Sequence, residues 1–181
     1  MESVRGQLLI AGPTVLDPHF WRAVVLVIEH SDEGAFGLVL NRPSETTVAD
    51  AVPELARLVE PGDDVFVGGP VQASAVIVLA RFEDPDEAAL IAFDDVGVLG
   101  IGEGSDDFEV GVRAGRAFIG HAGWGPGQLD DELERGDWIL ESALREDAFS
   151  ADPAELWGRV LARKGGSYAL VARMPPDPSV N

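Results

Sequence analysis

The sequence contains no cysteine among its 181 residues. This absence excludes a disulfide framework, a Cys-ligated zinc or iron–sulfur site and a thiol nucleophile. Long apolar runs are also missing: no stretch of about 20 apolar residues occurs, so we expect no transmembrane helix. The apolar segment 8–11 is too short for a signal-peptide core and is closely followed by Pro13. We therefore expect a cytoplasmic protein with no membrane partner.

Basic residues are scarce. Lys and Arg number 13 against 32 Asp and Glu, which gives a formal net charge of −19. Such a surface repels a nucleic-acid duplex or an anionic bilayer, because neutralising phosphates requires clustered Lys or Arg. We expect no direct nucleic-acid binding, and the sequence leaves open whether the partner is a protein or a small molecule.

Apolar residues make up 46% of the chain, which is typical of a globular protein and not of a disordered one. Domains usually span roughly 100–200 residues, so the length predicts one domain. A Pro-rich stretch begins at Pro175. We expect a single domain over residues 1–174 and a frayed tail over residues 175–181.

Two β-branched runs, 23–28 and 36–40, flank the polar segment Ser31-Asp32-Glu33-Gly34. A short polar loop that ends in Gly predicts an antiparallel hairpin. The continuous apolarity indicates that both faces of its strands are covered. Further strands are expected at residues 65–67, 75–81, 90–93, 96–99, 116–121, 138–141 and 168–173.

Three helices are also expected. The first follows a Thr-x-x-Asp capping box at Thr47, and Pro53 either kinks this helix or begins it. The other two, over 126–136 and 152–165, each have Pro just inside the start and Gly at the end. About nine strands and three helices in one domain predict an α+β architecture.

Established enzyme signatures are absent: the sequence has no Gly-x-Ser-x-Gly elbow, no Walker loop and no His-Glu-x-x-His helix. Gly100-x-Gly102-x-Gly104 imitates a dinucleotide turn, but Asp106-Asp107 would oppose a pyrophosphate, so we interpret the segment as a loop. The Asp-Asp pairs lack the ligand spacing of a calcium loop. We expect no cofactor and no metal, and we assign no catalytic residue.

The three histidines are the remaining candidates for acid–base groups. His19 lies in a turn and is expected at the surface. His30 and His121 end two expected strands, where functional sites are common. A histidine at such a position is nevertheless more often a hydrogen-bonding group of the scaffold.

Two glycine-rich segments, Gly68-Gly69-Pro70 and 120–128, are more informative. Glycine lets the backbone turn sharply or approach another group closely, and the helix start after the second segment presents free N–H groups. These features predict an anion or carbonyl pocket with Trp124 as its aromatic wall and His121 and Gln128 as polar groups. The alternative, which we favour, is that Trp124 anchors a tight turn into the core and the glycines allow the bend.

Several sequence blocks occur in order between residues 6 and 138. They are Gly6-Gln7-Leu8-Leu9-Ile10-Ala11, Asp17-Pro18-x-Phe20-x-Arg22, Glu29-His30, Gly34-Ala35-x-Gly37-Leu38-Val39-Leu40-Asn41-Arg42-Pro43, Gly68-Gly69-Pro70-Val71 and Gly120-x-Ala122-Gly123-Trp124-Gly125-x-Gly127-Gln128-Leu129. Together they resemble the AlgH/YqgE-type family of bacterial proteins. Two positions depart from the family pattern: Gly12 stands where a larger residue is common, and His121 where an aromatic such as Tyr often stands. The second departure argues against His121 as a catalytic base.

The resemblance implies a single α+β domain, located in the bacterial cytoplasm, whose bifurcated sheet closes into a pseudo-barrel. It implies no established reaction. Some relatives carry the label of transcriptional regulator, but the acidic composition argues against direct DNA contact, so regulation would act through a protein or a small-molecule partner. The polar residues within the matching blocks are Glu29, His30, Asn41, Arg42 and Gln128.

Our leading hypothesis is a non-enzymatic binding or regulatory module whose ligand contacts one concave site formed by His30, Asn41, Arg42 and the 120–128 loop. Arg42→Ala should then weaken binding of a partner or an anionic metabolite. The alternative is a hydrolase or transferase that uses His30 with a nearby carboxylate, Glu29 or Asp17. Neighbouring strand residues point to opposite faces, so Glu29 and His30 share a site only if a β-bulge intervenes.

Overall fold

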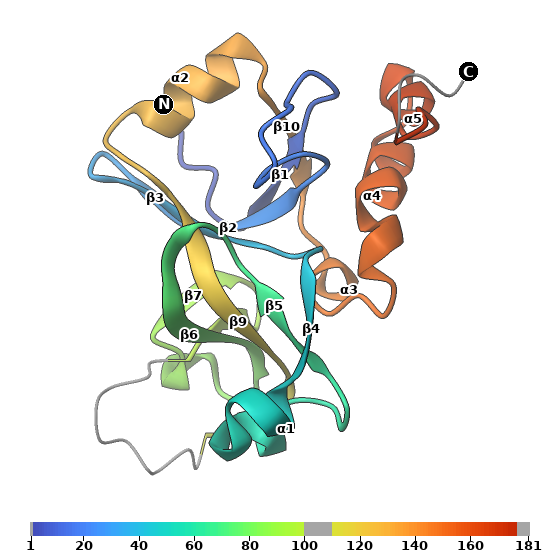
Figure 1. Cartoon of the computed structure of the whole chain (residues 1–181). Coiled ribbons are helices and arrows are strands. Elements are labelled where there is room, and N and C mark those ends of the chain that lie inside the picture. Colours follow the sequence, from blue (N-terminus) through green and yellow to red (C-terminus); the bar gives the residue numbers. More distant parts are fainter. Residues whose placement is uncertain (1, 100–109, 177–181) are drawn as a thin grey trace.

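One open β-sheet organises the chain in the computed structural model, which describes residues 2–99 and 110–176 (Figure 1). The strand order is β10-β1-β2-β3-β9-β6-β8-β7, and β4 joins this sheet through β5, which pairs with β9. Within the described residues the end strands β10 and β7 do not pair, so the sheet is not closed. The strands are β1 Gln7–Ala11, β2 Val24–Ser31, β3 Gly34–Val39, β4 Pro43–Thr47, β5 Asp64–Val67, β6 Val71–Phe82, β7 Leu90–Phe93, β8 Val96–Val98, β9 Val112–Trp124 and β10 Trp138–Ser142.

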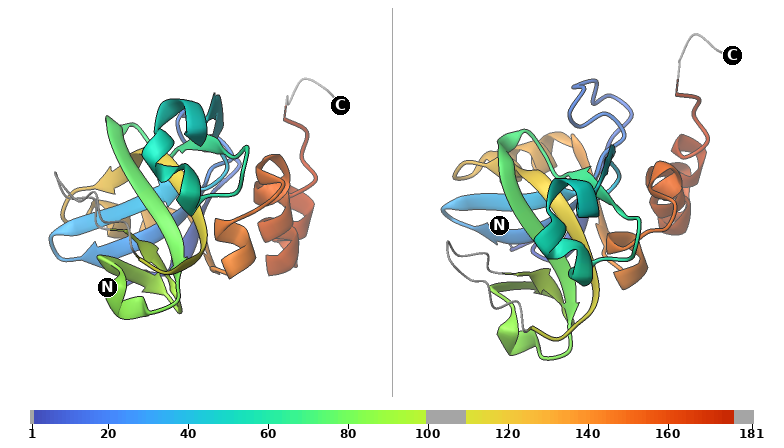
Figure 2. Two further views of the ribbon diagram at one scale, coloured as in Figure 1. Left: turned by 90° about the horizontal axis from the view of Figure 1, so that it is seen from below. Right: turned by 60° about the horizontal axis from the view of Figure 1, so that its bottom comes forward.

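Short helices flank this sheet, which makes the architecture a mixture of helix and sheet, in agreement with the predicted class. They are α1 Val48–Ala51, η1 Pro53–Leu58, η2 Pro85–Glu87, α2 Gln128–Arg135, α3 Arg145–Ala148, η3 Pro153–Glu155, α4 Leu156–Lys164 and α5 Ser167–Val171, where η denotes a 3-10 helix. In all the views α4 and α5 lie together beside the sheet, on the side away from η2 (Figures 1 and 2). No helix in the described part of the chain is both long enough and apolar enough to span a membrane.

The predicted hairpin is confirmed as β2 and β3, which pair antiparallel from Val25 opposite Val39 to Ser31 opposite Gly34. The register shifts between Val27 and Glu29, which marks a β-bulge in β2. This bulge precedes Glu29, whereas Glu29 and His30 pair in regular succession with Phe36 and Ala35, so it does not bring their side chains to one face.

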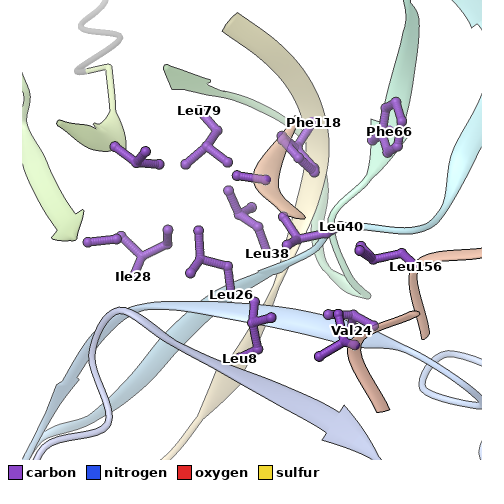
Figure 3. Packing of buried hydrophobic residues seen from close by; sticks show 14 of the residues in the cluster. Leu8, Val24, Leu26, Ile28, Leu38, Leu40, Phe66, Leu79, Phe118 and Leu156 are labelled. Carbon is purple, nitrogen blue, oxygen red and sulfur yellow. The ribbon is translucent and has the colours of Figure 1, made fainter. Parts of the chain in front are cut away.

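Strand β2 separates two apolar cores, which explains its continuous hydrophobic run. Val24, Leu26 and Ile28 belong to the core that contains Phe118, and Figure 3 shows them facing Leu38, Leu79 and Phe118. Val25 and Val27 point the other way, into a second core with Trp124, Leu129 and Trp138. Full burial of each such side chain contributes roughly 1.5–3 kcal/mol. A polar residue at any of these positions would therefore disrupt one core or the other.

The cap at Thr47 and the glycines at the helix ends are confirmed by the structure. The predicted helix starts are not: Pro126 precedes α2, which begins at Gln128, and Pro153 begins the separate 3-10 helix η3 before α4. The Thr47 hydroxyl accepts a hydrogen bond from the Asp50 N–H at 3.3 Å and caps α1, and Pro53 begins the separate helix η1. Helix α2 ends at Gly136, which adopts a positive φ of 77°, and α4 ends at Gly165. Glycine tolerates the left-handed backbone that closes a helix, because it has no Cβ.

The strand predicted at residues 168–173 is wrong, because Ser167–Val171 form helix α5. A short apolar run does not distinguish strand from helix by periodicity. Here the contact of this segment with α4 favours the helix. As part of that contact, the Lys164 ammonium lies 5.2 Å from the centre of the Tyr168 ring. Strands β1 and β4 and helix α3 were not predicted. The glycine segment 100–105 and the Asp106-Asp107 pair lie outside the described residues.

Candidate functional site

The structure does not bring all eight predicted site residues into one concave surface. His30 lies near the turn end of the β2–β3 hairpin, where it pairs with Ala35, whereas Asn41 contacts Val24 at the opposite end of β2. Six residue steps separate Val24 from His30, which is roughly 20 Å at about 3.3 Å per residue. The predicted residues therefore fall into separate groups.

His30 holds neighbouring segments together. Its Nδ1 accepts a hydrogen bond from the Val4 N–H at 3.2 Å, which places the ring proton on Nε2, and Nε2 lies 3.5 Å from Asp130 Oδ1. The side chain is only 6% exposed. Both ring nitrogens thus face protein groups, and the nearest carboxylate is that of Asp130, not Glu29 or Asp17. This geometry gives no support to His30 as an acid–base catalyst.

His121, Gly68 and Gly69 form a crossing point between chain segments. A Cβ on Gly69 would lie 2.2 Å from the His121 carbonyl carbon, and one on Gly68 would lie 2.4 Å from the Gly120 carbonyl oxygen. These contacts explain the glycines, because the group that approaches them is the protein's own β9 backbone. The His121 ring packs edge-on against Phe36 with centroids 4.9 Å apart. His19, in contrast, is exposed as expected.

Trp124 and Gln128 converge on Glu132, a residue that the sequence argument missed. The indole N–H of Trp124 donates to Glu132 Oε2 at 2.9 Å, and that of Trp138 donates to the same oxygen at 2.8 Å. The Gln128 amide donates to Oε1 at 3.0 Å. Trp124 is 7% exposed. It is anchored in the core, as the favoured interpretation states, and it also forms part of a polar network.

Asn41 and Arg42 lie at the far end of the hairpin, beside the C-terminal helices. The buried Asn41 amide accepts from the Val24 N–H at 3.0 Å and donates to the Arg22 carbonyl at 2.9 Å, so it continues the strand pairing. Arg42 donates from Nη1 to the Asn41 carbonyl at 3.3 Å and from Nη2 to the Trp21 carbonyl. These backbone bonds fix the direction of the Arg42 guanidinium.

Arg22 completes this cluster, although only its place in a motif block pointed to it. Its Nη2 donates to the Met174 carbonyl at 2.6 Å and to the Pro175 carbonyl at 2.9 Å. Pro175, at the start of the expected frayed tail, is therefore attached to the rest of the chain. The Arg22 guanidinium lies 4.4 Å from the centre of the Trp157 ring and 5.1 Å from that of Trp21.

These residues surround a cavity of about 360 Å³, which we call the arginine cavity. Its lining is Trp21, Arg22, Asn41, Arg42, Ala154, Glu155, Trp157, Gly158, Ala172 and Pro176. Burial lowers the pKa of both the Arg22 and the Arg42 guanidinium. Among the described residues no carboxylate, Glu155 included, lies within salt-bridge distance of either arginine. The arrangement favours a bound anion.

Metal binding has no comparable basis in the part of the chain that the structure describes. No group of three or more His, Asp or Glu side chains there is placed to hold a metal ion.

The protein thus combines a mixed helix–sheet fold with a ligand-sized cavity at the end of its central hairpin. Comparison with known proteins identifies its family. The AlgH-like family model matches residues 8–169. A UPF0301 protein of Streptomyces coelicolor is 41% identical over 188 residues, covering 100% of this chain and 97% of that protein. The chain belongs to the AlgH-like family, which confirms the resemblance of its sequence blocks. These relatives are uncharacterised proteins, so membership assigns no activity.

Solved structures agree with this assignment. A crystal structure of a Corynebacterium diphtheriae protein superposes with a TM-score of 0.85 at 30% identity, covering 96% of this chain and 94% of that one. The solution structure of the AlgH protein from Pseudomonas aeruginosa gives a TM-score of 0.71 at 26% identity, with 98% of each chain covered.

Proposed function

We propose that the protein is a non-enzymatic binding module that holds a small anion in the arginine cavity. The observation that carries this proposal is the pair of guanidinium groups facing one cavity in a chain whose net charge is −19. Each guanidinium is half-buried and has lost part of its hydration without gaining a carboxylate partner, and an anionic ligand would supply that partner.

The hydrogen-bonding capacity of both arginines supports a ligand. A guanidinium carries five N–H donors. The hydrogen bonds of Arg22 involve Nη2 alone, so its Nε and Nη1 groups have no acceptor among the described residues. Arg42 likewise has an unused Nε. These donors suit a carboxylate or a phosphate, which accept forked hydrogen bonds from Arg.

The backbone of Arg22 also supports a specific role. Its φ is 52°, in the left-handed region that non-glycine residues seldom adopt. This conformation costs roughly 1–2 kcal/mol. Such strain is typical of positions where a side chain must be aimed, and here it accompanies the placement of the guanidinium over the Trp157 ring.

Size and wall chemistry narrow the ligand class. A volume of about 360 Å³ lies within the roughly 300–1,000 Å³ of small-molecule sites. Trp21 and Trp157 supply flat apolar walls. The proposed ligand is therefore a compact carboxylate or phosphate compound, and not a nucleic-acid duplex.

Arg42→Ala tests the proposal, with Arg113→Ala as the control because Arg113 is exposed and does not line the cavity. Calorimetric titration with inorganic phosphate, pyrophosphate and citrate should show binding of at least one anion to the wild type. Arg42→Ala should weaken that binding about tenfold or more, since hydrogen bonds to charged groups contribute about 1.5–3 kcal/mol. The control should bind normally. The proposal fails if none of the three anions binds, or if both variants lose affinity equally.

We also propose that residues 1–174 act as one domain with 175–181 as its tail, and that the sheet is a bifurcated pseudo-barrel. The pairing of β9 with β3, β5 and β6 supports the branching. The hydrogen bond from Arg5 Nε to the Ile91 carbonyl at 2.7 Å supports an approach of β7 to the β2 side of the sheet.

A cytoplasmic location stays a prediction. We propose that the regulatory role acts through the bound ligand and not through direct contact with DNA.

A further inference from the structure

A second cavity, of about 450 Å³, lies between the loop after β1, the start of α2 and the start of β10. Its lining is Thr14, Val15, Leu16, Asp17, Phe20, Gly123, Trp124, Gln128, Glu132, Asp137 and Trp138. This lining contains aromatic rings and carboxylates but no Lys, Arg or His. Its charge is thus opposite to that of the arginine cavity, and we call it the aromatic cavity.

The rings of the aromatic cavity stand at steep angles to one another. Phe20 and Trp138 have centroids 5.6 Å apart and an interplanar angle of 83°. Trp124 and Trp138 have centroids 6.1 Å apart and an angle of 75°. This edge-to-face arrangement is a favourable one for aromatic rings and fixes the three side chains relative to one another. Each π-face is negative and attracts a cation placed over it.

Glu132 adds a fixed negative charge to these walls. Both indole N–H groups hold its Oε2, at 2.9 and 2.8 Å, and the Gln128 amide holds Oε1. No cation among the described residues lies within salt-bridge distance of it. Asp137, in contrast, is paired with Arg135 at 3.0 Å. Glu132 is therefore an oriented, half-buried carboxylate without a counter-ion.

We infer that the aromatic cavity binds a small organic cation, namely an ammonium group that carries compact apolar substituents. The aromatic faces and the apolar side chains of Val15 and Leu16 suit the substituents, and Glu132 attracts the charge. The volume fits a small molecule. The inference is independent of the anion proposal, because the two cavities share no lining residue.

The first test compares choline with 3,3-dimethyl-1-butanol, which has the same shape but carbon in place of the charged nitrogen. Binding is followed by the indole N–H resonances in a ¹H–¹⁵N NMR titration of the wild type. Choline should bind at least about tenfold more tightly than the alcohol. It should shift Trp124 and Trp138 more than Trp21 and Trp157, which lie at the arginine cavity. Equal affinities, no binding of choline up to about 10 mM, or shifts centred on Trp21 and Trp157 would overturn the inference.

The second test removes the charge and keeps the shape of the side chain. Glu132→Gln should weaken choline binding about tenfold and leave binding of the neutral alcohol unchanged. Asp131→Asn is the matched control, since it changes the same charge on an exposed position of α2 outside the cavity. Should Glu132→Gln fail to fold, Asp17→Asn removes a lining charge without touching the indoles and should weaken choline binding severalfold. An unchanged choline affinity in the folded lining variant would refute the inference. Arg42→Ala should bind choline normally, which separates this test from that of the anion site.

Discussion

Asp147 provides the sharpest test of which contacts stabilise the packing of helices α3 and α4. It is 1% exposed, and its carboxylate accepts hydrogen bonds from Arg163 Nη1 and Nη2, both at 2.9 Å, and from the Leu144 N–H at 2.8 Å. The hydrogen bonds to Asp147 raise the pKa of Arg163 against the opposing effect of burial. This pair ties α3 to α4, the helix that supplies Trp157 to the arginine cavity.

Asp147→Asn keeps the size of the side chain and removes its charge. Removing one partner of a buried ion pair costs about 3–5 kcal/mol. The cost here should be lower, because Arg163 is 29% exposed and also donates to the Ser142 carbonyl at 3.0 Å. Water and that carbonyl can partly replace the interactions that the Arg163 guanidinium loses. We therefore expect a loss of about 2–3 kcal/mol in the free energy of unfolding.

Urea unfolding monitored by tryptophan fluorescence measures this loss. With a slope of about 2 kcal/mol per molar urea, the midpoint should fall by roughly 1–1.5 M. Asp137→Asn is the control, since the Arg135–Asp137 pair is exposed at 60% and 41% and should contribute less than about 1 kcal/mol. Equal midpoints for the two variants would refute the reasoning that burial makes the Asp147 pair the stronger one.

The remaining predictions concern the largely buried carboxylate of Asp95 and Gly69, where two chain segments cross. Burial raises the pKa of Asp95, but hydrogen bonds from Arg81 and Arg145 outweigh this effect and hold the pKa below its ordinary value. A carboxylate whose pKa is lower in the folded than in the unfolded state stabilises the folded protein fully above about pH 4. This stabilisation is lost as the pH falls through the pKa of the folded state. The stability difference between wild type and Asp95→Asn should therefore shrink below about pH 4 in urea titrations, and a constant difference would contradict the assignment. Gly69→Ala should destabilise by at least about 2 kcal/mol, because its φ is 151° and its Cβ would meet the β9 backbone. Gly62→Ala, with a φ of 88° but no atom within 4 Å, should lose only about 1 kcal/mol, and thermal unfolding compares the two.

Local patterns in the sequence predicted the parts of the fold that local interactions determine. The hairpin of β2 and β3 and the ends of α2 and α4 depend on turn and capping residues within a few positions of one another. The prediction for residues 168–173 was wrong, because five apolar or aromatic residues in a row suit a strand and a short helix equally. Only the packing of α5 on α4 distinguishes them.

The two cavities differ in how well their lining residues could be predicted from their spacing in the sequence. Gln128 and Glu132 are four apart on α2 and so share a helix face, and Trp124 and Trp138 flank that helix. Most of the aromatic cavity thus comes from one short segment, and the spacing of Glu132 after Gln128 was a signal in the sequence. Arg22 and Trp157, however, meet from opposite ends of the chain. The arginine cavity could not be predicted from local spacing, since it exists only once α4 and α5 dock beside the strand end that carries Asn41.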